Sequence, residues 1–414
     1  MISKLQTPQI RFTGFNEDWE KSTLSEVADI YDGTHQTPHY TNSGVMFLSV
    51  ENINTLVSKK CISEADFKRD FKNFPEKNDV LMTRIGDVGT ANIVTSSDPL
   101  AYYVSLALLK PKNIVPTYLK IAIASDFVQR DIWRRTLHIA FPKKINKNEI
   151  TKVEIFTPPL QVEQTAIGNL FQNIDQTIAL QRRKHEQTQT LKKSLLSKMF
   201  PKKGQKQPEI RLKGFSGNWV ESKFFDNIES IIDFRGRTPK KIGLEWSEKG
   251  YLALSALNVK NGYIDFNLDK HFGNEELYQK WMGGKELVAG QVLFTTEAPM
   301  GNVAQVPDNK GYILSQRTIA FNIRKDLLTD DFLAILLKSP VTFNMLESMS
   351  SGGTAKGVSQ KSLANLQVVT PQQLEEQTAI GQFFKQLDDT LSLQAKQLKT
   401  LENLKQALLA KMFV

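Results

Sequence analysis

The six residues Glu163-Gln-Thr-Ala-Ile-Gly168 occur twice in this chain, and this repeat constrains the fold more than any other feature of the sequence. They return unchanged as Glu376-Gln-Thr-Ala-Ile-Gly381. Around them, residues 157–200 and 370–413 align without a gap and agree at roughly half of their positions, which indicates an internal repeat rather than a chance match. The sequence therefore predicts two copies of one structural plan.

Each copy of this repeat carries apolar residues at alternating steps of four and three. In the first copy they are Ile167, Phe171, Ile174 and Ile178, then Leu195 and Met199 beyond a polar middle. In the second copy they are Ile380, Phe384, Leu387, Leu391, Leu398, Leu401, Leu408 and Met412. Sustained over about five heptads, this spacing predicts the seam of a coiled coil. An amphipathic helix lying on its own domain is the alternative that the same spacing allows.

The length of the two predicted helices indicates how they pack. A helix of roughly 38 residues is about 57 Å long, which exceeds the width of a domain of about 150 residues. Two near-identical seams are most simply satisfied by packing on each other in antiparallel directions. Gln181 and Gln394 occupy equivalent seam positions near the middles, so we expect them to approach one another, where a buried polar pair can fix the register. Two solvated glutamines are the alternative.

The composition is that of an ordinary globular protein. The chain has 414 residues, 40% of them hydrophobic, which is enough for two or three domains with their own cores. No uninterrupted apolar stretch approaches the roughly 18 residues that a membrane span needs, so we expect a cytoplasmic protein with no membrane partner. Cys61 is the single cysteine, which excludes an intramolecular disulfide and a cysteine-based zinc site.

The charge of the chain favours a polyanionic partner but does not identify one. The formal net charge is +9 and the pI is about 9.2. Basic residues gather in the first predicted helix and just beyond it, at Arg182, Arg183, Lys184, Lys192, Lys193, Lys198, Lys202, Lys203 and Lys206. Such a run can equally be a solvated face, so charge alone leaves nucleic-acid binding open.

A second repeat opens each half of the chain. Pro8-Gln-Ile-Arg-Phe-Thr-Gly-Phe15, closed by Trp19, returns as Pro208-Glu-Ile-Arg-Leu-Lys-Gly-Phe215, closed by Trp219. These repeats predict a first domain, a helical segment, a second domain and a second helical segment, at 1–156, 157–200, 201–369 and 370–414.

Each domain is predicted to mix strands and helix. Short β-rich runs broken by Gly, Asn, Asp and Pro lie at 45–50, 80–84, 90–95 and 102–109, and again at 251–257, 292–296, 302–306 and 312–323. Apolar periodicity predicts one helix over 117–135 and one over 330–349. Outside these frame positions the two domains differ, which predicts two related docking surfaces for two different targets. Drift after a duplication, with only one domain still working, is the alternative.

The sequence lacks the motifs of ATP hydrolysis and methyl transfer. Gly283-Gly-Lys285 has neither the first glycine nor the following hydroxyl of a phosphate loop, and there is no Asn-Pro-Pro-aromatic run. His35 and His39 are separated by Pro38, so they cannot share a helix face as zinc ligands do. We therefore predict no ATP hydrolysis by this chain, and no cofactor or metal of its own.

As a set, these features resemble the DNA specificity subunit of type I restriction-modification systems over essentially the whole chain. The resemblance is carried by the duplicated opening, the Thr37-Pro38 loop, the strand region that closes in Gly89 or Gly301, and the run Pro158-Pro-Leu-Gln-Val-Glu-Gln164 before the long helix. The second copy departs from that run as Pro371-Gln-Gln373, which affects only the local turn.

This resemblance implies a fold and a set of partners. The implied fold is α+β, with two tandem-related mixed α/β target-recognition domains joined by two long helices that form an antiparallel coiled coil with pseudo-twofold symmetry. Each domain would read one half of a split, asymmetric double-stranded DNA site. Catalysis would lie in two modification (methyltransferase) subunits, which methylate adenine, and in restriction (motor-nuclease) subunits, which use ATP. An architectural coiled-coil protein, or a regulatory or anti-restriction relative that binds modification subunits, is the alternative.

Polar and basic residues beside turns are the predicted DNA contacts. Arg and Gln can make paired hydrogen bonds to guanine and adenine, whereas Lys more often holds phosphate. In the first domain the predicted contacts are Thr34, His35, Gln36, Thr37, Arg84, Asp87, Lys143, Lys144 and Lys147. In the second domain they are Arg235, Arg237, Lys240, Lys241, Thr296, Glu297, Lys356 and Lys361. Any one of them can instead have a purely structural role.

Overall fold

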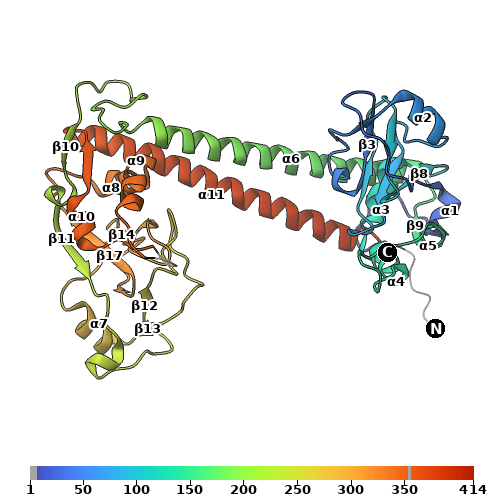
Figure 1. The fold of residues 1–414 in the computed structure, drawn as a ribbon. Coiled ribbons are helices and arrows are strands. Elements are labelled where there is room, and N and C mark those ends of the chain that lie inside the picture. Colours follow the sequence, from blue (N-terminus) through green and yellow to red (C-terminus); the bar gives the residue numbers. More distant parts are fainter. Residues whose placement is uncertain (1–6, 353–355) are drawn as a thin grey trace. The chain divides into compact units, whose positions relative to one another are not determined.

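The computed structural model describes residues 7–352 and 356–414, and the chain forms two compact units. Unit 1 combines residues 1–182 with 396–414, and unit 2 comprises residues 183–395. Each unit therefore contains one globular domain and a part of each long helix. The same succession of strands builds both units (Figure 1).

Unit 1 arranges its strands in a four-stranded sheet of order β2-β8-β5-β6, a three-stranded sheet of order β4-β3-β7 and the pair β1-β9. The strands are β1 Glu20–Thr23, β2 Ala28–Asp32, β3 Val45–Leu48, β4 Cys61–Ile62, β5 Val80–Thr83, β6 Ala91–Ile93, β7 Leu100–Tyr102, β8 Leu106–Pro111 and β9 Glu154–Thr157. The helices are α1 Leu24–Val27, η1 Val50–Asn52, α2 Glu64–Asp70, α3 Pro116–Ile123, α4 Asp126–Arg135, α5 Lys147–Ile150 and the first part of α6 Gln161–Lys198.

Unit 2 repeats these three sheets in the same order, as β11-β17-β14-β15, β13-β12-β16 and β10-β18. Its strands are β10 Val220–Lys223, β11 Ile228–Asp233, β12 Tyr251–Leu254, β13 Phe272–Gly273, β14 Val292–Thr295, β15 Val303–Gln305, β16 Tyr312–Leu314, β17 Thr318–Ile323 and β18 Gln367–Thr370. Its helices are η2 Phe224–Asn227, η3 Pro239–Ile242, α7 Glu275–Met282, α8 Asp330–Lys338, α9 Pro340–Ser348, α10 Gln360–Asn365 and the first part of α11 Leu374–Lys411. The predicted duplication of a mixed α/β domain is confirmed.

The four-stranded sheet of each unit is buried on both faces. In β5, Val80 and Met82 join the hydrophobic cluster on the helix side, whereas Leu81 joins the cluster that contains Phe47 of the three-stranded sheet. The central strand β14 of unit 2 alternates in the same way. Because successive side chains of a strand point to opposite faces, burial of both faces explains why these strands are continuous apolar runs.

The prediction of a single helix over 117–135 and of another over 330–349 is wrong, because the structure has two helices in each segment: α3 and α4 in the first, α8 and α9 in the second. In unit 2, α8 ends at Lys338 and α9 begins at Pro340. Ser339 caps α9, with its Oγ accepting from the Thr342 amide at 3.3 Å. Proline has no amide hydrogen to continue a helix and favours a first turn, so the chain starts again there. The apolar spacing runs through the break and hides it.

The two sequence repeats bond to each other within each unit. In unit 1, Arg11 of the opening motif donates to both carboxylate oxygens of Glu163, at 2.6 and 2.8 Å. In unit 2, Arg211 and Glu376 form the same pair at 2.7 and 2.8 Å. Both carboxylates are buried. The repeated Arg and Glu thus fix the start of each long helix to its domain.

The rest of the repeated hexapeptide fits the same junction. Gln164 accepts from a backbone amide just before α3 at 2.9 Å and donates to a carbonyl just before α6 at 2.9 Å. A Cβ atom on Gly168 would lie 2.2 Å from Thr117 Oγ1, so only glycine allows α6 to approach α3 this closely. Gln377 and Gly381 repeat both features in unit 2.

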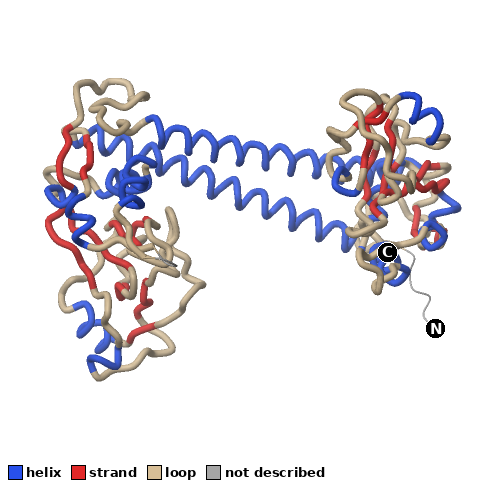
Figure 2. Tube along the Cα trace, in the orientation of Figure 1, coloured by secondary structure: helices blue, strands red, loops and turns tan. Residues whose placement is uncertain are grey.

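Both interpretations of the helical repeat hold in part. The first turns of α6 belong to the domain core, where Phe171 is 1% exposed. The last residues of α11 enter the same core, and Phe413 packs edge-on against Trp19 at 5.9 Å between ring centroids. Phe384 and Phe200 occupy the corresponding places in unit 2. Beyond these core segments, the parts of the two 38-residue helices that belong to one unit pair with each other within that unit, as in Arg182–Glu402 of unit 1 and Gln394–Thr188 of unit 2 (Figure 2).

In unit 1, α6 and α11 run antiparallel. Asp175 on α6 accepts from Lys405 on α11 at 2.6 Å and from Lys120 on α3 at 3.3 Å. Further along α6, Arg182 bonds to Glu402 at 3.0 Å. Residues with higher numbers on α6 therefore pair with residues with lower numbers on α11, as antiparallel helices require. The Asp175 carboxylate ties both long helices to the domain.

Unit 2 contains the equivalent carboxylate, Asp388 on α11, which pairs with Lys192 on α6 and lies 3.8 Å from Lys338 on α8. The predicted pairing of Gln181 with Gln394 is wrong. Gln181 donates to Gln397 at 3.3 Å, and Gln394 donates to Thr188 at 3.3 Å. Each glutamine therefore bonds within its own unit to a partner other than the predicted one.

Candidate nucleic-acid interface

In unit 1, segments that carry predicted DNA contacts meet at one end of the four-stranded sheet. β2 ends at Asp32 and β5 at Thr83, while β8, which pairs with both, begins at Leu106. Because antiparallel neighbours reverse direction, these strand ends lie at the same edge. Residues 33–37 and 84–87 follow directly from them, so the fold brings the two segments to one place.

Residues 143–145, which we call the strap, bring lysines to the same edge. The Lys143 carbonyl accepts from the Gly86 amide at 2.8 Å, and the last amide of the strap donates to the Arg84 carbonyl at 2.9 Å. Lys143 and Lys144 are exposed. Three separate parts of the chain therefore contribute predicted residues to one surface, which we call the sheet-end surface.

Unit 2 repeats the sheet-end surface. The amide of Thr296, which follows β14, donates to the Arg317 carbonyl at 2.8 Å. An amide of residues 356–358 donates in turn to the Thr296 carbonyl at 2.9 Å. Residues 356–358 therefore take the place of the strap, and Lys356 takes the place of Lys143.

Most of the predicted residues present their side chains to solvent. The exposed ones are His35, Gln36, Thr37, Asp87, Lys143, Lys144, Arg235, Lys240, Lys241, Lys356 and Lys361, and the half-buried ones are Thr34, Lys147, Arg237 and Glu297. Local bonds orient some of them: Asp87 accepts from Thr90 at 2.7 Å, and Lys241 donates to the Gly236 carbonyl at 2.7 Å. Their contact with DNA stays a prediction.

Arg84 is enclosed by the protein. Its side chain is 7% exposed, forms an ion pair with Asp32 and donates through Nε to the Ile145 carbonyl at 3.2 Å. A base contact would have to break a buried ion pair, which is costly. The prediction of Arg84 as a direct contact is therefore corrected: it holds the strand end and the strap together beneath the surface.

Thr296 is also buried, at 1% exposure, and its hydroxyl donates to the Arg317 carbonyl at 3.2 Å. This prediction is corrected for the same reason, since a side chain without accessible surface cannot touch a base. Arg317 itself is half exposed and pairs with Glu297 at 2.9 Å. The sequence prediction missed Arg317, because residues 312–323 were predicted as one continuous strand, whereas Arg317 lies in the turn between β16 and β17.

The two units stabilise the end of their second strand differently. In unit 1, Asp32 is paired with the enclosed Arg84. In unit 2, Asp233 accepts from Arg235 at 2.9 Å and from Gln360 at 2.8 Å. Burial acts to raise the pKa of Asp233, but the hydrogen bonds from Arg235 and Gln360 outweigh it and lower that pKa. The ionised carboxylate therefore holds an exposed arginine at the surface where unit 1 has a buried one.

An aromatic ring supports one cation at each sheet-end surface. Lys143 Nζ lies 4.6 Å from the centroid of the Trp133 ring, and the Arg237 guanidinium lies 4.4 Å from that of Phe234. Such stacking attracts a cation to the ring face and restricts its position. Neither ring was predicted from the sequence, because the contacts depend on the folded loops.

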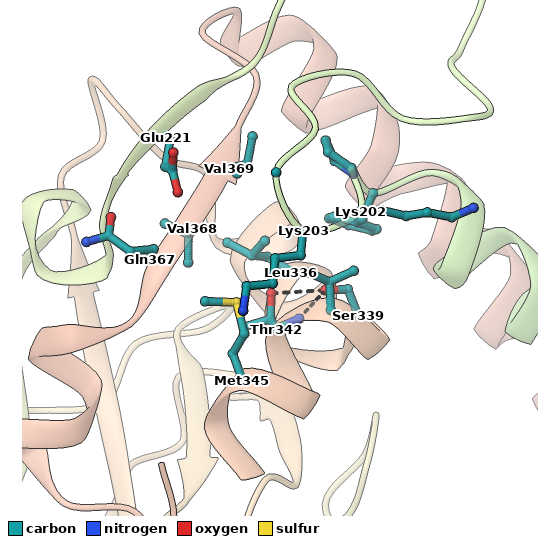
Figure 3. A pocket seen from close by; sticks show the side chains of 14 residues that line it. Lys202, Lys203, Glu221, Leu336, Ser339, Thr342, Met345, Gln367, Val368 and Val369 are labelled. Carbon is teal, nitrogen blue, oxygen red and sulfur yellow. Dashed lines mark hydrogen bonds between the residues drawn. The ribbon is translucent and has the colours of Figure 1, made fainter. Parts of the chain in front are cut away.

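A pocket of about 180 Å³ lies elsewhere in unit 2, between the residues that follow α6, the β10-β18 pair and helices α8 and α9 (Figure 3). Figure 3 shows Lys202 and Lys203 on one side of it, Val369 on another, and the hydrogen bond between Ser339 and Thr342. None of the predicted DNA contacts lines this pocket. It is therefore separate from the sheet-end surface.

Within 7–352 and 356–414, no group of three or more His, Cys, Asp or Glu side chains is placed to hold a metal ion. In the same two ranges, none of the helices has the length and apolar character needed to cross a membrane.

Two stretches of the chain, residues 16–190 and 218–403, match the type I restriction modification DNA specificity domain. In Methanocaldococcus jannaschii, the provisionally assigned specificity subunit of the type I restriction enzyme MjaX is 24% identical over 415 residues, which cover 95% of this chain and 92% of that protein. The specificity subunit of the MjaVIII enzyme from the same organism is 24% identical over 277 residues, covering 64% of this chain and 62% of that one.

Solved structures share the fold. The S subunit of a type I restriction-modification system from M. genitalium superposes with a TM-score of 0.59 at 15% identity and covers 99% of both chains. A chain from a structure on complex assembly and conformational transition of the type I R-M system gives a TM-score of 0.54 at 17% identity, covering 95% of this chain and 97% of that one. These likenesses confirm the duplicated α/β architecture with two long helices.

Two similar domains, joined by long helices, are the architecture of these specificity subunits. The chain belongs to the type I restriction modification DNA specificity domain family. It is a DNA sequence-specificity subunit, a non-catalytic component whose partners are DNA and the other members of a restriction-modification complex.

Proposed function

We propose that the two units read the two halves of an asymmetric, bipartite site in double-stranded DNA. The recognition domains are residues 1–156 and 201–369, and the helical segments 157–200 and 370–414 set the distance between the half-sites. Each domain uses its sheet-end surface: basic side chains hold phosphates, and Arg, Gln and neighbouring polar residues read base edges.

The observation that carries this proposal is that equivalent positions of the two sheet-end surfaces differ in chemistry while their backbone bonds agree. Unit 1 has a buried Ser105 where unit 2 has the exposed Arg317. Likewise, the enclosed Arg84 of unit 1 occupies the position that the smaller Thr296 occupies in unit 2. In unit 2, the exposed Arg235 follows the end of β11. The same backbone arrangement thus carries two different sets of side-chain hydrogen-bond donors and acceptors, which is suited to reading two different base sequences.

The remaining partners follow from the non-catalytic nature of the chain. We infer a cytoplasmic complex in which it binds two modification subunits, which methylate the site, and restriction subunits, which cleave DNA. In this complex, the chain supplies the specificity for the DNA sequence and the scaffold on which the other subunits assemble.

Coexpression with a modification subunit, followed by genome-wide mapping of methylated adenines, tests this function. We expect methylation at one defined motif only when both proteins are present. An architectural coiled-coil protein would leave methylation unchanged and would not bind the modification subunit. A regulatory or anti-restriction relative would bind the modification subunit without directing methylation to a motif.

The two exposed lysines of the strap give a quantitative prediction. Replacing both Lys143 and Lys144 with alanine should weaken DNA binding about equally on all sequences, because lysines at this position hold phosphates rather than bases. The slope of log binding constant against log salt concentration should fall by about one per lysine. Binding titrations at several salt concentrations measure this slope. A selective loss at one base pair, with an unchanged slope, would show that the strap reads sequence.

A further inference from the structure

The loop of residues 137–144 in unit 1, which we call the tip loop, exposes two large apolar side chains. Ile139 and Phe141 have 99% and 104% of their reference surface accessible. The loop is closed at its base, where the Leu137 amide donates to the Lys144 carbonyl at 2.7 Å. The two side chains contribute nothing to the core. Exposed apolar surface costs free energy in water, and apolar side chains gathered on a surface are typical of interaction sites.

The position of the tip loop places these side chains at the sheet-end surface. Its last two residues, Lys143 and Lys144, are the first two of the strap. The strap is bonded to the residues that follow β5, through the Gly86 amide and the Arg84 carbonyl at 2.8 and 2.9 Å. The apolar tip therefore rises from the same surface that carries the predicted DNA contacts of unit 1.

The charge around the tip indicates which class of partner it meets. From residue 132 to residue 148 the sequence contains no Asp or Glu, but it contains Lys143, Lys144 and Lys147. Arg134 and Arg135 also lie there, but they pair with Asp131. Lys143 stacks on the half-exposed ring of Trp133 next to the tip. Lysines are depleted at the centre of apolar surfaces that bind protein. Apolar side chains framed by cations and an aromatic ring suit a polyanion with apolar faces, which is a nucleic acid.

We propose that Ile139 and Phe141 contact the bases of the DNA bound by unit 1, a proposal that rests on the function proposed above. The chemistry they recognise is apolar: either the C5-methyl group of thymine in the major groove or the face of a base at a partly unstacked step. The equivalent segment of unit 2 has the sequence Ser351-Gly-Gly-Thr-Ala-Lys-Gly357, without an aromatic or branched aliphatic residue. The apolar contact therefore belongs to the first half-site alone.

The test uses the full chain assembled with its modification subunits, on duplexes that carry the motif found by methylation mapping. Phe141→Ala and Ile139→Ala should each weaken binding to this motif by about tenfold, in the range seen when a stacked or groove-bound apolar side chain is truncated. The matched control is Val162→Ala, which removes an apolar side chain that is 72% exposed on α6. It should leave binding unchanged. Circular dichroism of each variant shows whether it is folded.

Two further arms identify the contact. Replacing thymines of the first half-site with uracil removes only the methyl groups, and it should abolish the effect of Phe141→Ala or Ile139→Ala if these side chains touch a methyl. Fluorescence of 2-aminopurine in the first half-site should rise on binding if they meet an unstacked base face. In either case, a photo-crosslinking residue at position 141 should attach to DNA, within the first half-site.

Different failures have different meanings. If folded Phe141→Ala and Ile139→Ala complexes bind the motif as tightly as the unchanged complex does, the apolar contact is overturned while the proposed function stands. The same follows if position 141 crosslinks to a modification or restriction subunit and not to DNA, which would make the tip loop a protein-docking element. If the unchanged complex binds no sequence selectively, the proposed function fails and this contact fails with it.

Discussion

Replacing Glu163 with glutamine should lower the free energy of unfolding of unit 1 by about 3–5 kcal/mol. The Glu163 side chain is completely buried and takes two hydrogen bonds from Arg11, whose side chain is 12% exposed. Glutamine keeps the size of the side chain but removes its charge, so the Arg11 guanidinium is left partly buried without a counter-charge. The junction that starts α6 on its domain would lose its main polar support.

The duplicated chain provides an internal comparison for this prediction. Glu376→Gln should lower the free energy of unfolding of unit 2 by less than Glu163→Gln lowers that of unit 1. Arg211 also donates to the Ser216 carbonyl at 2.9 Å, and this hydrogen bond remains in the variant. Glu51→Gln is the control, since it breaks only an exposed pair with Lys60 and should have little effect. Hydrogen exchange read by mass spectrometry reports the two units separately. A loss at Glu163 no greater than that at Glu51 would contradict the structural role of the repeat.

Deleting residues 181–187, one heptad of α6, should change the distance between the two methylated half-sites and leave both half-sites unchanged. Seven helical residues span about 10 Å, close to three base pairs of DNA, and a heptad approximately preserves the phase of the seam. The partner helix keeps its full length, so we expect a shift of at most about three base pairs. A matching deletion around Gln394 should enlarge it.

Removing two residues from the same segment should abolish activity, because two is far from any heptad multiple and the remaining seam would face away from its partner. The methylated motif of each variant, mapped genome-wide, measures both outcomes. The deletion also removes the bond between Gln181 and Gln397, so each variant should first be shown to be folded. An unchanged spacer in a stable, active heptad-deleted protein would show that the helices do not set the distance.

The parts of the fold that could be predicted from the sequence are those that the chain repeats. The hexapeptide predicted both long helices, and the structure explains its residues: a buried Glu for Arg11, a Gln that satisfies backbone groups, and the glycine Gly168 where α6 touches α3. Each of these requirements recurs in unit 2, so the repeat preserves them. Repetition made a contact over long sequence separation visible without any knowledge of the fold.

What could not be predicted depends on contacts that occur in one unit only. Arg84 and Thr296 were both predicted as DNA contacts because they follow a strand, yet each is enclosed by groups distant in sequence. Arg317 lies in the turn between β16 and β17, inside a stretch that was predicted as one continuous strand, so its exposure was not predicted. Ile139 and Phe141 lie in a short loop whose sequence resembles a core segment, and only the structure shows that both are exposed.

The most direct test of the central claim, that two unlike sheet-end surfaces read two half-sites, is the methylated motif of the unchanged chain beside that of Arg235→Ala. We expect two different half-sites separated by unread base pairs, with centres about one helical turn, near 10 base pairs, apart. Because the exposed Arg235 lies on unit 2 alone, its replacement should cost about 1–3 kcal/mol and relax one position in one half-site. A continuous or palindromic motif would contradict the account, as would an Arg235→Ala protein that methylates the same motif less efficiently with no position relaxed.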